Sequence, residues 1–379
     1  MPQQKYFGFN SINHLKKILS KHNPSHIFLV TGRNSYEKSG AKDALNALLK
    51  GYNATRFCDF EENPKLFDVE RGMKVFKKNK CNFVIAVGGG SVIDVAKSVR
   101  LFAANDGKPE DYLQKGKSIR KKGKVLIAVP TTAGSGSEAT KFAVVYIDKI
   151  KHSLEHEFVL PDYAIVDPQF TMSLPKYITA CTGMDAFSQA IESYWSVNSA
   201  DESKRYAREA IKLIMANLAN AVNKPSEKSR EAMAKAANLA GKAINITRTT
   251  ACHAISYPIT SYFNVPHGHA VALTLGQMLI YNSNVTKDDL LDKRGVNYVK
   301  KIISEIVKLL EAENTEDAGN KIKNLMNEIG LSARLSGLGI KSDEDIELII
   351  RNGFDPSRVN NNPRKLTEGA LRRILNEIR

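Results

Sequence analysis

Two histidines, His253 and His267, stand fourteen residues apart, and Pro266 and Gly268 frame the second of them. This spacing is typical of a metal site that a turn closes. Far upstream, Asp185 supplies a carboxylate that could be a third ligand. One carboxylate and two imidazoles suit Fe²⁺ or Zn²⁺ and leave a coordination position open for a substrate oxygen. A single histidine is more often structural, but the three residues together predict a metal site.

Two more polar side chains share helix faces with this set. Gln189 follows Asp185 by four residues in a helical pattern, and Tyr257 follows His253 by four. Residues four apart lie on the same face of a helix. We therefore expect Gln189 and Tyr257 to face the metal site, with the amide of Gln189 as a weaker, neutral ligand.

Three glycines, Gly88, Gly89 and Gly90, follow an apolar run at residues 83–87 and precede a helical pattern. Without Cβ atoms, the backbone amides of such a turn can approach a pyrophosphate closely, and the N-terminus of the following helix favours an anion. The order differs from GxGxxG, so the ordinary dinucleotide fingerprint is absent. The glycines therefore predict a phosphate-binding turn, with a tight strand-to-helix connection as the simpler alternative.

Ser91 and Asp94 come next in the chain and have two interpretations each. They are expected to contact the cofactor, or else to form the N-cap and N3 positions of a capping box. A second loop of small residues, at 130–138, also follows a strand pattern. Two such loops at neighbouring strand ends would enclose one nucleotide. The expected contacts from this loop are Thr131, Thr132 and Ser137.

The end of the first apolar run, at residues 27–30, bears on the choice of cofactor. A carboxylate that binds the ribose often stands at such a point in NAD-binding folds, but here the chain has Gly32 and Arg33. A carboxylate would repel a 2′-phosphate, whereas an arginine could bind it. We therefore expect NADPH to be used at least as readily as NADH, although Gly32 could simply start a turn. Asn63 and Lys151 complete the expected cofactor-binding residues.

The first half of the chain alternates short apolar runs with helical patterns. The apolar runs are residues 27–30, 83–87, 125–129 and 163–166, and the helical patterns include residues 39–50 and 65–78. This alternation predicts an α/β fold with a parallel sheet and flanking helices, whose ligands bind at the carboxyl ends of the strands. Helical periodicity then dominates, at residues 206–220, 230–246, 296–313 and 366–378. We expect an α/β dinucleotide-binding domain at residues 1–176 and an all-helical metal- and substrate-binding domain at residues 177–379.

The composition is that of an ordinary globular protein, since 42% of the 379 residues are hydrophobic and 25% are charged. No apolar run approaches the length of a membrane helix and the N-terminus has no signal-peptide core, so we expect a cytoplasmic protein without a membrane partner. The four scattered cysteines indicate a reducing compartment. The net charge of +15 is dispersed, which argues against nucleic acid and leaves a lysine-rich surface or the steering of anionic ligands.

Four motifs follow one another along the chain: GGGSVIDVAK from Gly88, PTTAGSGSE from Pro130, GMDAFSQAIES from Gly183 and PHGHA from Pro266. In this order they resemble the iron-containing (group III) alcohol dehydrogenases over essentially the whole chain. The resemblance implies a nucleotide domain and a helical domain with a cleft between them, as in the dehydroquinate synthase-like architecture. It also implies NADPH or NADH, Fe²⁺ or Zn²⁺, a small aldehyde or alcohol as substrate, and a homodimer or higher homo-oligomer. The family's ligand pattern maps onto Asp185, His253 and His267.

The chain departs from this family at two positions. Gln189 stands where a histidine ligand is usual, so it would be a fourth ligand or lie just outside the metal's shell. Tyr257 replaces a histidine that many members carry, so the product oxygen would be protonated through Tyr257, water or a cofactor hydroxyl. Residues 188–199 and 247–258 look most like the corresponding segments of the phosphonoacetaldehyde reductases. Arg248 and Lys242, in the helical segment that leads to His253, could then bind a phosphonate or could lie on a solvated face.

The sequence thus predicts an NAD(P)H-dependent, metal-assisted reduction of a small aldehyde, with phosphonoacetaldehyde converted to 2-hydroxyethylphosphonate. An alternative is a general short-chain alcohol dehydrogenase, or a polyol or glycerol-phosphate dehydrogenase of the same family. Dehydroquinate synthase shares the architecture but catalyses no net redox change, so it represents a second class of enzyme that must be distinguished from a dehydrogenase. The least favoured alternative is a regulatory nucleotide-binding protein that has lost its catalytic activity. The replacement of two histidines by Gln189 and Tyr257 is the reason to consider it.

Overall fold

The computed structural model describes residues 2–148 and 150–379, which form two compact units, Met1–Leu174 and Pro175–Arg379. The domain boundary predicted from the sequence lies between residues 176 and 177, whereas the boundary between the two compact units lies two residues earlier in the chain. Helix α7 therefore belongs entirely to the second unit, since it begins at Lys176. No helix among the described residues combines the length and apolar character needed to cross a membrane.

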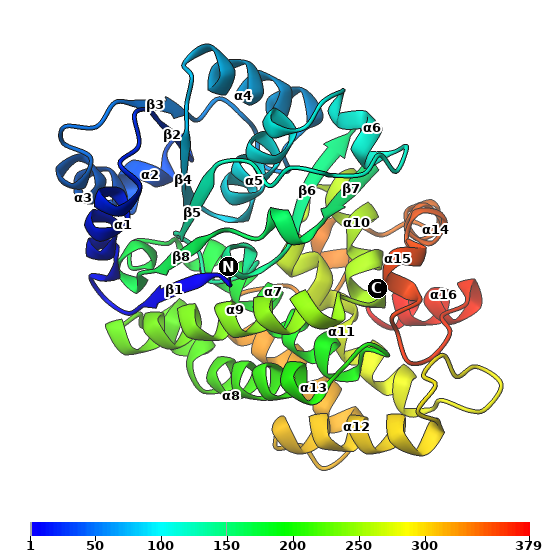
Figure 1. Ribbon diagram of the computed structural model, residues 1–379. Helices are drawn as coiled ribbons and strands as arrows, with labels where there is room; N and C mark the ends of the chain where they lie inside the picture. The colour runs from blue at the N-terminus through cyan, green and yellow to red at the C-terminus, as the bar shows by residue number, and fades with distance from the viewer. Residues whose placement is uncertain (1, 149) are drawn as a thin grey trace. The chain divides into compact units, whose positions relative to one another are not determined.

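The first unit is built on a six-stranded sheet in which all neighbouring strands are parallel (Figure 1). In spatial order the strands are β1 (Gln4–Phe7), β8 (Tyr163–Val166), β5 (Val125–Pro130), β4 (Phe83–Gly88), β2 (Ile27–Thr31) and β3 (Ala54–Phe57). The four predicted strands are confirmed, and they are the interior strands. Strands β1 and β3 lie at the two edges and carry exposed residues, which is why their apolar signal is too weak to predict.

Helices cover both faces of this sheet. Alternate residues of β2 point to opposite sides: Phe28 and Val30 pack in a cluster with residues of α4 and α5, whereas Ile27 and Leu29 pack with α1 and α3. This two-sided burial explains the continuous apolar runs of the interior strands. The helices are α1 (His14–His22), α2 (Ser35–Lys38), α3 (Ala41–Leu48), α4 (Leu66–Lys78), α5 (Gly90–Ala104) and α6 (Pro109–Leu113).

A two-stranded antiparallel sheet, β6 (Phe142–Ile147) and β7 (Ile150–Glu155), was not predicted from the sequence. It follows the small-residue loop at 130–138 and packs against α5. Short 3₁₀ turns complete this unit at Ser11–Asn13, Ser137–Ala139, Glu157–Val159 and Pro168–Thr171.

The second unit is helical, as predicted. Helix α7 (Lys176–Trp195) is buried along most of its length and packs against α8, α9, α11 and α12. The other helices are α8 (Asp201–Asn223), α9 (Glu227–Thr247), α10 (Ala251–Phe263), α11 (His267–Ser283), α12 (Val296–Leu309), α13 (Thr315–Glu328), α14 (Asp343–Asn352), α15 (Pro356–Val359) and α16 (Glu368–Glu377), with a 3₁₀ turn at Ser336–Leu338.

Gly268 allows α11 to approach α7 closely enough to build a site. A Cβ atom at this position would lie 2.0 Å from the carbonyl oxygen of Cys181 and 2.8 Å from Cβ of Asp185. Only glycine fits such an approach of one helix to another's backbone. The contact sets the first residue of α11, His267, beside the face of α7 that carries Asp185.

Candidate active site

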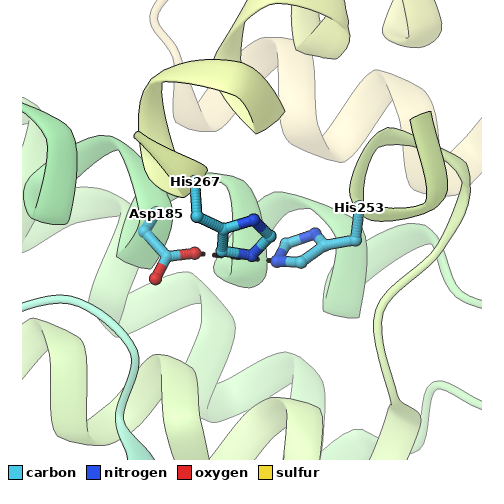
Figure 2. Close-up of side chains that lie close together, drawn as sticks. All are labelled: Asp185, His253 and His267. Carbon is cyan, nitrogen blue, oxygen red and sulfur yellow. Dashed lines mark ion pairs between the residues drawn. The ribbon is translucent and has the colours of Figure 1, made fainter. Parts of the chain in front are cut away.

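Three side chains from three helices converge in the second unit. Asp185 comes from the middle of α7, His253 from the first turn of α10 and His267 from the first residue of α11 (Figure 2). One ligand atom of each lies within 4.8 Å of the others, and His253 Nε2 is 3.6 Å from Asp185 Oδ1. A carboxylate and two imidazoles at this separation form a donor set that fits Fe²⁺ or Zn²⁺.

Burial and charge at this point favour a cation. Asp185 and His253 are both buried, and His267 is half-buried. Burial opposes a charged imidazole, but the carboxylates of Glu192 and Asp185 raise the pKa of His253 to about 9. Burial likewise opposes the Asp185 carboxylate, but His253 and His267 lower its pKa. Two buried carboxylates around imidazoles supply the negative charge that a divalent cation would neutralise.

Glu192 is a functional residue that the sequence reasoning missed. It lies two helical turns beyond Asp185 on α7 and is fully buried. Its Oε2 contacts Nδ1 of His253, and its Oε1 accepts hydrogen bonds from Thr250 Oγ1 at 2.6 Å and Cys252 N at 3.0 Å. Glu192 therefore holds both the ring of His253 and the N-terminus of α10. Its spacing of seven residues from Asp185, on the same helix face, was the available signal.

Gln189 lies beside Asp185, on the helix face where the sequence places it. Its Nε2 donates a hydrogen bond to Asp185 Oδ1 at 3.1 Å, and the side chain is buried. The amide thus orients the carboxylate in this structure. Direct ligation by Gln189 remains a prediction.

Tyr257 also faces the site. Its ring stacks on the ring of His267 with centroids 6.3 Å apart and an interplanar angle of 27°. Its hydroxyl accepts a hydrogen bond from Nε of Arg358 at 3.2 Å. Arg358, on α15, is a second residue that the sequence reasoning missed, because more than a hundred residues separate it from its contact.

Arg248 does not lie in a helix that continues to His253, so the prediction of a continuous helical segment is wrong. Helix α9 ends at Thr247, and α10 begins only at Ala251. Arg248 is the C-cap of α9, with φ 60° and ψ 174°, a backbone conformation found almost only at glycine. Lys242 places its ammonium 5.5 Å from the ring centroid of Tyr206 on α8. The structure thus gives Lys242 a packing contact within the helix bundle.

The two glycine-containing loops of the first unit are joined at adjacent strand ends. Gly88 at the end of β4 pairs in register with Pro130 at the end of β5, and Thr131 N donates a hydrogen bond to Gly88 O at 3.0 Å. A Cβ atom at Gly90 would lie 2.8 Å from Ser135 Oγ. Gly89 lies similarly close to Thr132, since its Cβ would be 3.4 Å from Cγ2.

The capping box, one of the two interpretations of Ser91 and Asp94, is not formed. Helix α5 begins at Gly90 with Gly89 as its N-cap, so Ser91 is already its second residue. Ser91 Oγ accepts a hydrogen bond from Asn63 N at 3.3 Å. Asp94 instead accepts from Ser137 Oγ at 2.6 Å and from the backbone N of Val144 at 3.0 Å. Asp94 therefore ties α5 to the second loop.

Lys97, one turn after Asp94, anchors the same loop from inside the first unit. It is fully buried, and its Nζ donates to the carbonyl oxygens of Ser137, Thr140 and Phe142 at 2.6 to 3.0 Å. Burial lowers the pKa of Lys97 to about 8. Burial raises the pKa of Asp94, and the positive charge of Lys151, a half-buried residue on β7, acts in the opposite direction.

Arg33 has an acidic neighbour that the sequence reasoning did not foresee. Its Nη2 lies 2.7 Å from Asp59 Oδ1, and its Nε donates to Cys58 O at 3.2 Å. Asp59 follows the edge strand β3, so the parallel pairing of β2 with β3 brings it to the end of β2. A carboxylate is therefore present near Gly32 and Arg33 after all.

Comparison with known proteins assigns both units to one family. Residues 2–168 match iron-containing alcohol dehydrogenase, and residues 179–378 match the Fe-containing alcohol dehydrogenase family, C-terminal. Together with the fold, these matches define a metal-dependent, NAD(P)-linked oxidoreductase that interconverts alcohols and aldehydes. The chain belongs to the iron-containing alcohol dehydrogenase family.

Three relatives illustrate the range of substrates. The long-chain-alcohol dehydrogenase 1 of Geobacillus thermodenitrificans is 31% identical over 382 residues, which cover 98% of this chain and 94% of that protein. The phosphonoacetaldehyde reductase of Streptomyces viridochromogenes is 31% identical over 79% of this chain and 76% of its own length. The solved structure of sulfoacetaldehyde reductase from Bifidobacterium kashiwanohense, in complex with NAD⁺, has a TM-score of 0.89 at 31% identity, covering 100% and 97% of the two chains. Because these three identities are equal, overall sequence similarity does not select one substrate, and the substrate has to be argued from the residues of the site.

Proposed function

We propose that the protein uses NADPH or NADH to reduce a small anionic aldehyde, with phosphonoacetaldehyde converted to 2-hydroxyethylphosphonate. The observation that carries the reductase assignment is the buried convergence of Asp185, His253 and His267. The loops at Gly88–Gly90 and 130–138 are the proposed cofactor site. We further propose cytoplasmic localisation and assembly as a homodimer or higher homo-oligomer.

In this proposal each residue of the site has a separate role in the reduction. Fe²⁺ or Zn²⁺ bound by Asp185, His253 and His267 would polarise the aldehyde carbonyl, and the reduced nicotinamide would supply the hydride. Glu192 holds the ring of His253 in place, and Gln189 orients the carboxylate of Asp185. Tyr257, water or a cofactor hydroxyl would supply the proton to the product oxygen, so that one hydride and one proton convert aldehyde to alcohol; the stacking of Tyr257 on His267 supports the first of these.

The anionic substrate is supported by two lines of reasoning. Relatives at 31% identity include reductases named for phosphonoacetaldehyde and sulfoacetaldehyde, two-carbon aldehydes that carry a tetrahedral oxyanion. The loop between α9 and α10 presents Arg248 five residues before His253. A long-chain alcohol dehydrogenase is equally similar in sequence, so a general alcohol dehydrogenase is the second candidate.

A substrate panel tests this proposal. Oxidation of NADPH and NADH would be followed with phosphonoacetaldehyde, sulfoacetaldehyde, propanal and longer aldehydes, while metal content is measured on the same preparation. We expect stoichiometric metal and a kcat/KM for phosphonoacetaldehyde well above that for propanal. A preference for the neutral aldehydes would reject the anionic substrate but retain the reductase. Protein without metal that oxidises neither cofactor would indicate a regulatory relic.

A further inference from the structure

Arg358 is a buried cation that contacts Tyr257, the residue stacked on His267. It lies on the short helix α15, and only 9% of its surface is exposed. Its Nε donates to the hydroxyl of Tyr257 at 3.2 Å, and its Nη1 donates to the carbonyl oxygen and Oγ of Ser357 at 3.2 and 3.3 Å. A guanidinium keeps its charge at all accessible pH values, so Arg358 is a permanent positive charge at a buried position.

Tyr257 connects this guanidinium to the site. It follows His253 by one helical turn on α10, and its ring stacks on that of His267. Arg358 thus lies at the hydroxyl end of a ring whose face contacts a metal ligand. Tyr257 is thus the one residue that separates Arg358 from His267 along this chain of contacts.

The segment that carries Arg358 is held in place by an asparagine. Nδ2 of Asn361 donates to Ser357 O at 2.8 Å and to Thr249 O at 3.0 Å, while its Oδ1 accepts from Asn198 Nδ2 at 3.0 Å. These bonds join α15 to the loop that carries Arg248. A cation on a segment fixed in this way is preorganised, so little ordering is required when a ligand binds.

We propose that Arg358 is the specificity-determining residue that binds the anionic end of the aldehyde, with the Tyr257 hydroxyl fixing the orientation of its guanidinium. This inference rests on the proposed anionic substrate and adds the site that recognises it. A guanidinium has five N–H donors, so Arg358 can keep its bonds to Tyr257 and Ser357 and still donate to an oxygen of a phosphonate or sulfonate. Arg248 is exposed, so the buried Arg358 supplies the larger part of the discrimination.

The test compares variants by the ratio of kcat/KM for phosphonoacetaldehyde to kcat/KM for propanal. Arg358→Met keeps most of the volume but removes the charge, and it should lower this ratio roughly tenfold to a hundredfold, the range for a charge-assisted contact. Arg358→Lys should recover only part of the loss, because an ammonium has three donors and cannot keep the contacts to Tyr257 and Ser357 while it binds the substrate anion. Sulfoacetaldehyde as a third substrate shows whether the site favours a phosphonate or a sulfonate.

Arg364 provides a matched control. It lies six residues further along, is also largely buried, and pairs with Asp289 at 2.7 Å. Arg364→Met should leave the substrate ratio within twofold of the wild type. Equilibrium binding of 2-hydroxyethylphosphonate, measured by calorimetry with and without Arg358, gives a readout independent of turnover.

The outcomes separate the inference from the proposed function. Wild-type protein that prefers anionic aldehydes, with Arg358→Met losing both rates equally and binding the product as before, overturns the role of Arg358 alone. Wild-type protein without such a preference overturns the proposed substrate and this inference together. If Arg358→Met does not fold, Arg358→Lys and Tyr257→Phe decide: unchanged ratios in both also overturn the inference.

Discussion

Glu192 contacts His253 through the ring nitrogen that does not face Asp185. The carboxylate meets Nδ1, while Nε2 lies 3.6 Å from Asp185 Oδ1. A carboxylate on one imidazole nitrogen fixes the tautomer and ring orientation and makes the other nitrogen a better metal ligand. The relationship identifies Nε2 as the atom that His253 offers to a metal.

Replacing Glu192 with glutamine should weaken metal binding about tenfold to a hundredfold, the usual effect of losing such a partner. The variant keeps the shape but removes the negative charge that supports His253. Competition with a chelator measures the affinity directly. Glu305→Gln, which alters a contact to Tyr194 from α12, is the control and should bind metal as the wild type does. Equal affinity in Glu192→Gln would contradict a positioning role.

The sequence predicts the interior of the first unit well because its strands are buried on both faces and read as continuous apolar runs. It does not predict β1 and β3, whose exposed residues dilute that pattern. The β6–β7 hairpin is also missed. Its strands mix buried residues with half-buried and exposed ones, and the sequence between them carries no typical two-residue turn signal.

The candidate site is predictable where a residue belongs to a recognisable sequence motif. Motif spacing is enough to select Asp185, His253 and His267, and the structure brings these three together. Arg358 and Asp59 cannot be found in this way, because each acquires its importance from a contact made only in the folded chain. The prediction for Arg248 requires one helix to continue to His253, whereas three residues between α9 and α10 interrupt it.

His267→Ala should remove most bound metal and activity while the helical unit stays folded. The side chain is half-buried and lies at the start of α11, so its loss leaves no large cavity. The control is His269→Gln, two residues along the same helix, where Nε2 contacts the carbonyl oxygen of Ser332 instead. Metal analysis and circular dichroism of both variants check the prediction. Stoichiometric metal in His267→Ala would remove this residue from the ligand set.

Asp59 should limit the use of NADPH. Its carboxylate is 2.7 Å from Arg33 and would repel a 2′-phosphate while neutralising the cation that could bind it. Asp59→Asn is therefore expected to raise kcat/KM for NADPH relative to NADH by a factor of several, and more at low salt.

Gly32→Asp supplies the opposite change at the same place. A Cβ atom at Gly32 would come closest to the hydroxyl of Ser35, at 2.1 Å, and this hydroxyl can rotate away, so the fold should tolerate the substitution. The added carboxylate should reduce NADPH use selectively. Equal changes with both cofactors in either variant would show that these residues do not lie near the 2′ position.

Arg248→Gly should stabilise the protein relative to Arg248→Ala, although both variants lack the guanidinium. With φ 60° and ψ 174°, residue 248 has a conformation that costs a residue with a Cβ atom on the order of 1–3 kcal/mol. Glycine avoids this strain but loses about 0.4–1 kcal/mol through its more flexible unfolded chain. The net difference in unfolding free energy should therefore favour glycine by about 1 kcal/mol or somewhat more, measurable by urea denaturation.

The substrate ratio of the same two variants shows why a strained arginine is retained. If Arg248 helps to draw in an anionic aldehyde, both variants should lose part of the preference for phosphonoacetaldehyde over propanal, by a smaller factor than Arg358→Met because Arg248 is exposed. Glycine would then be the more stable and the less selective choice, as expected where backbone strain is kept for function. Equal stability of the two variants would show that the position is not strained. A wild-type substrate ratio in both would remove Arg248 from substrate recognition.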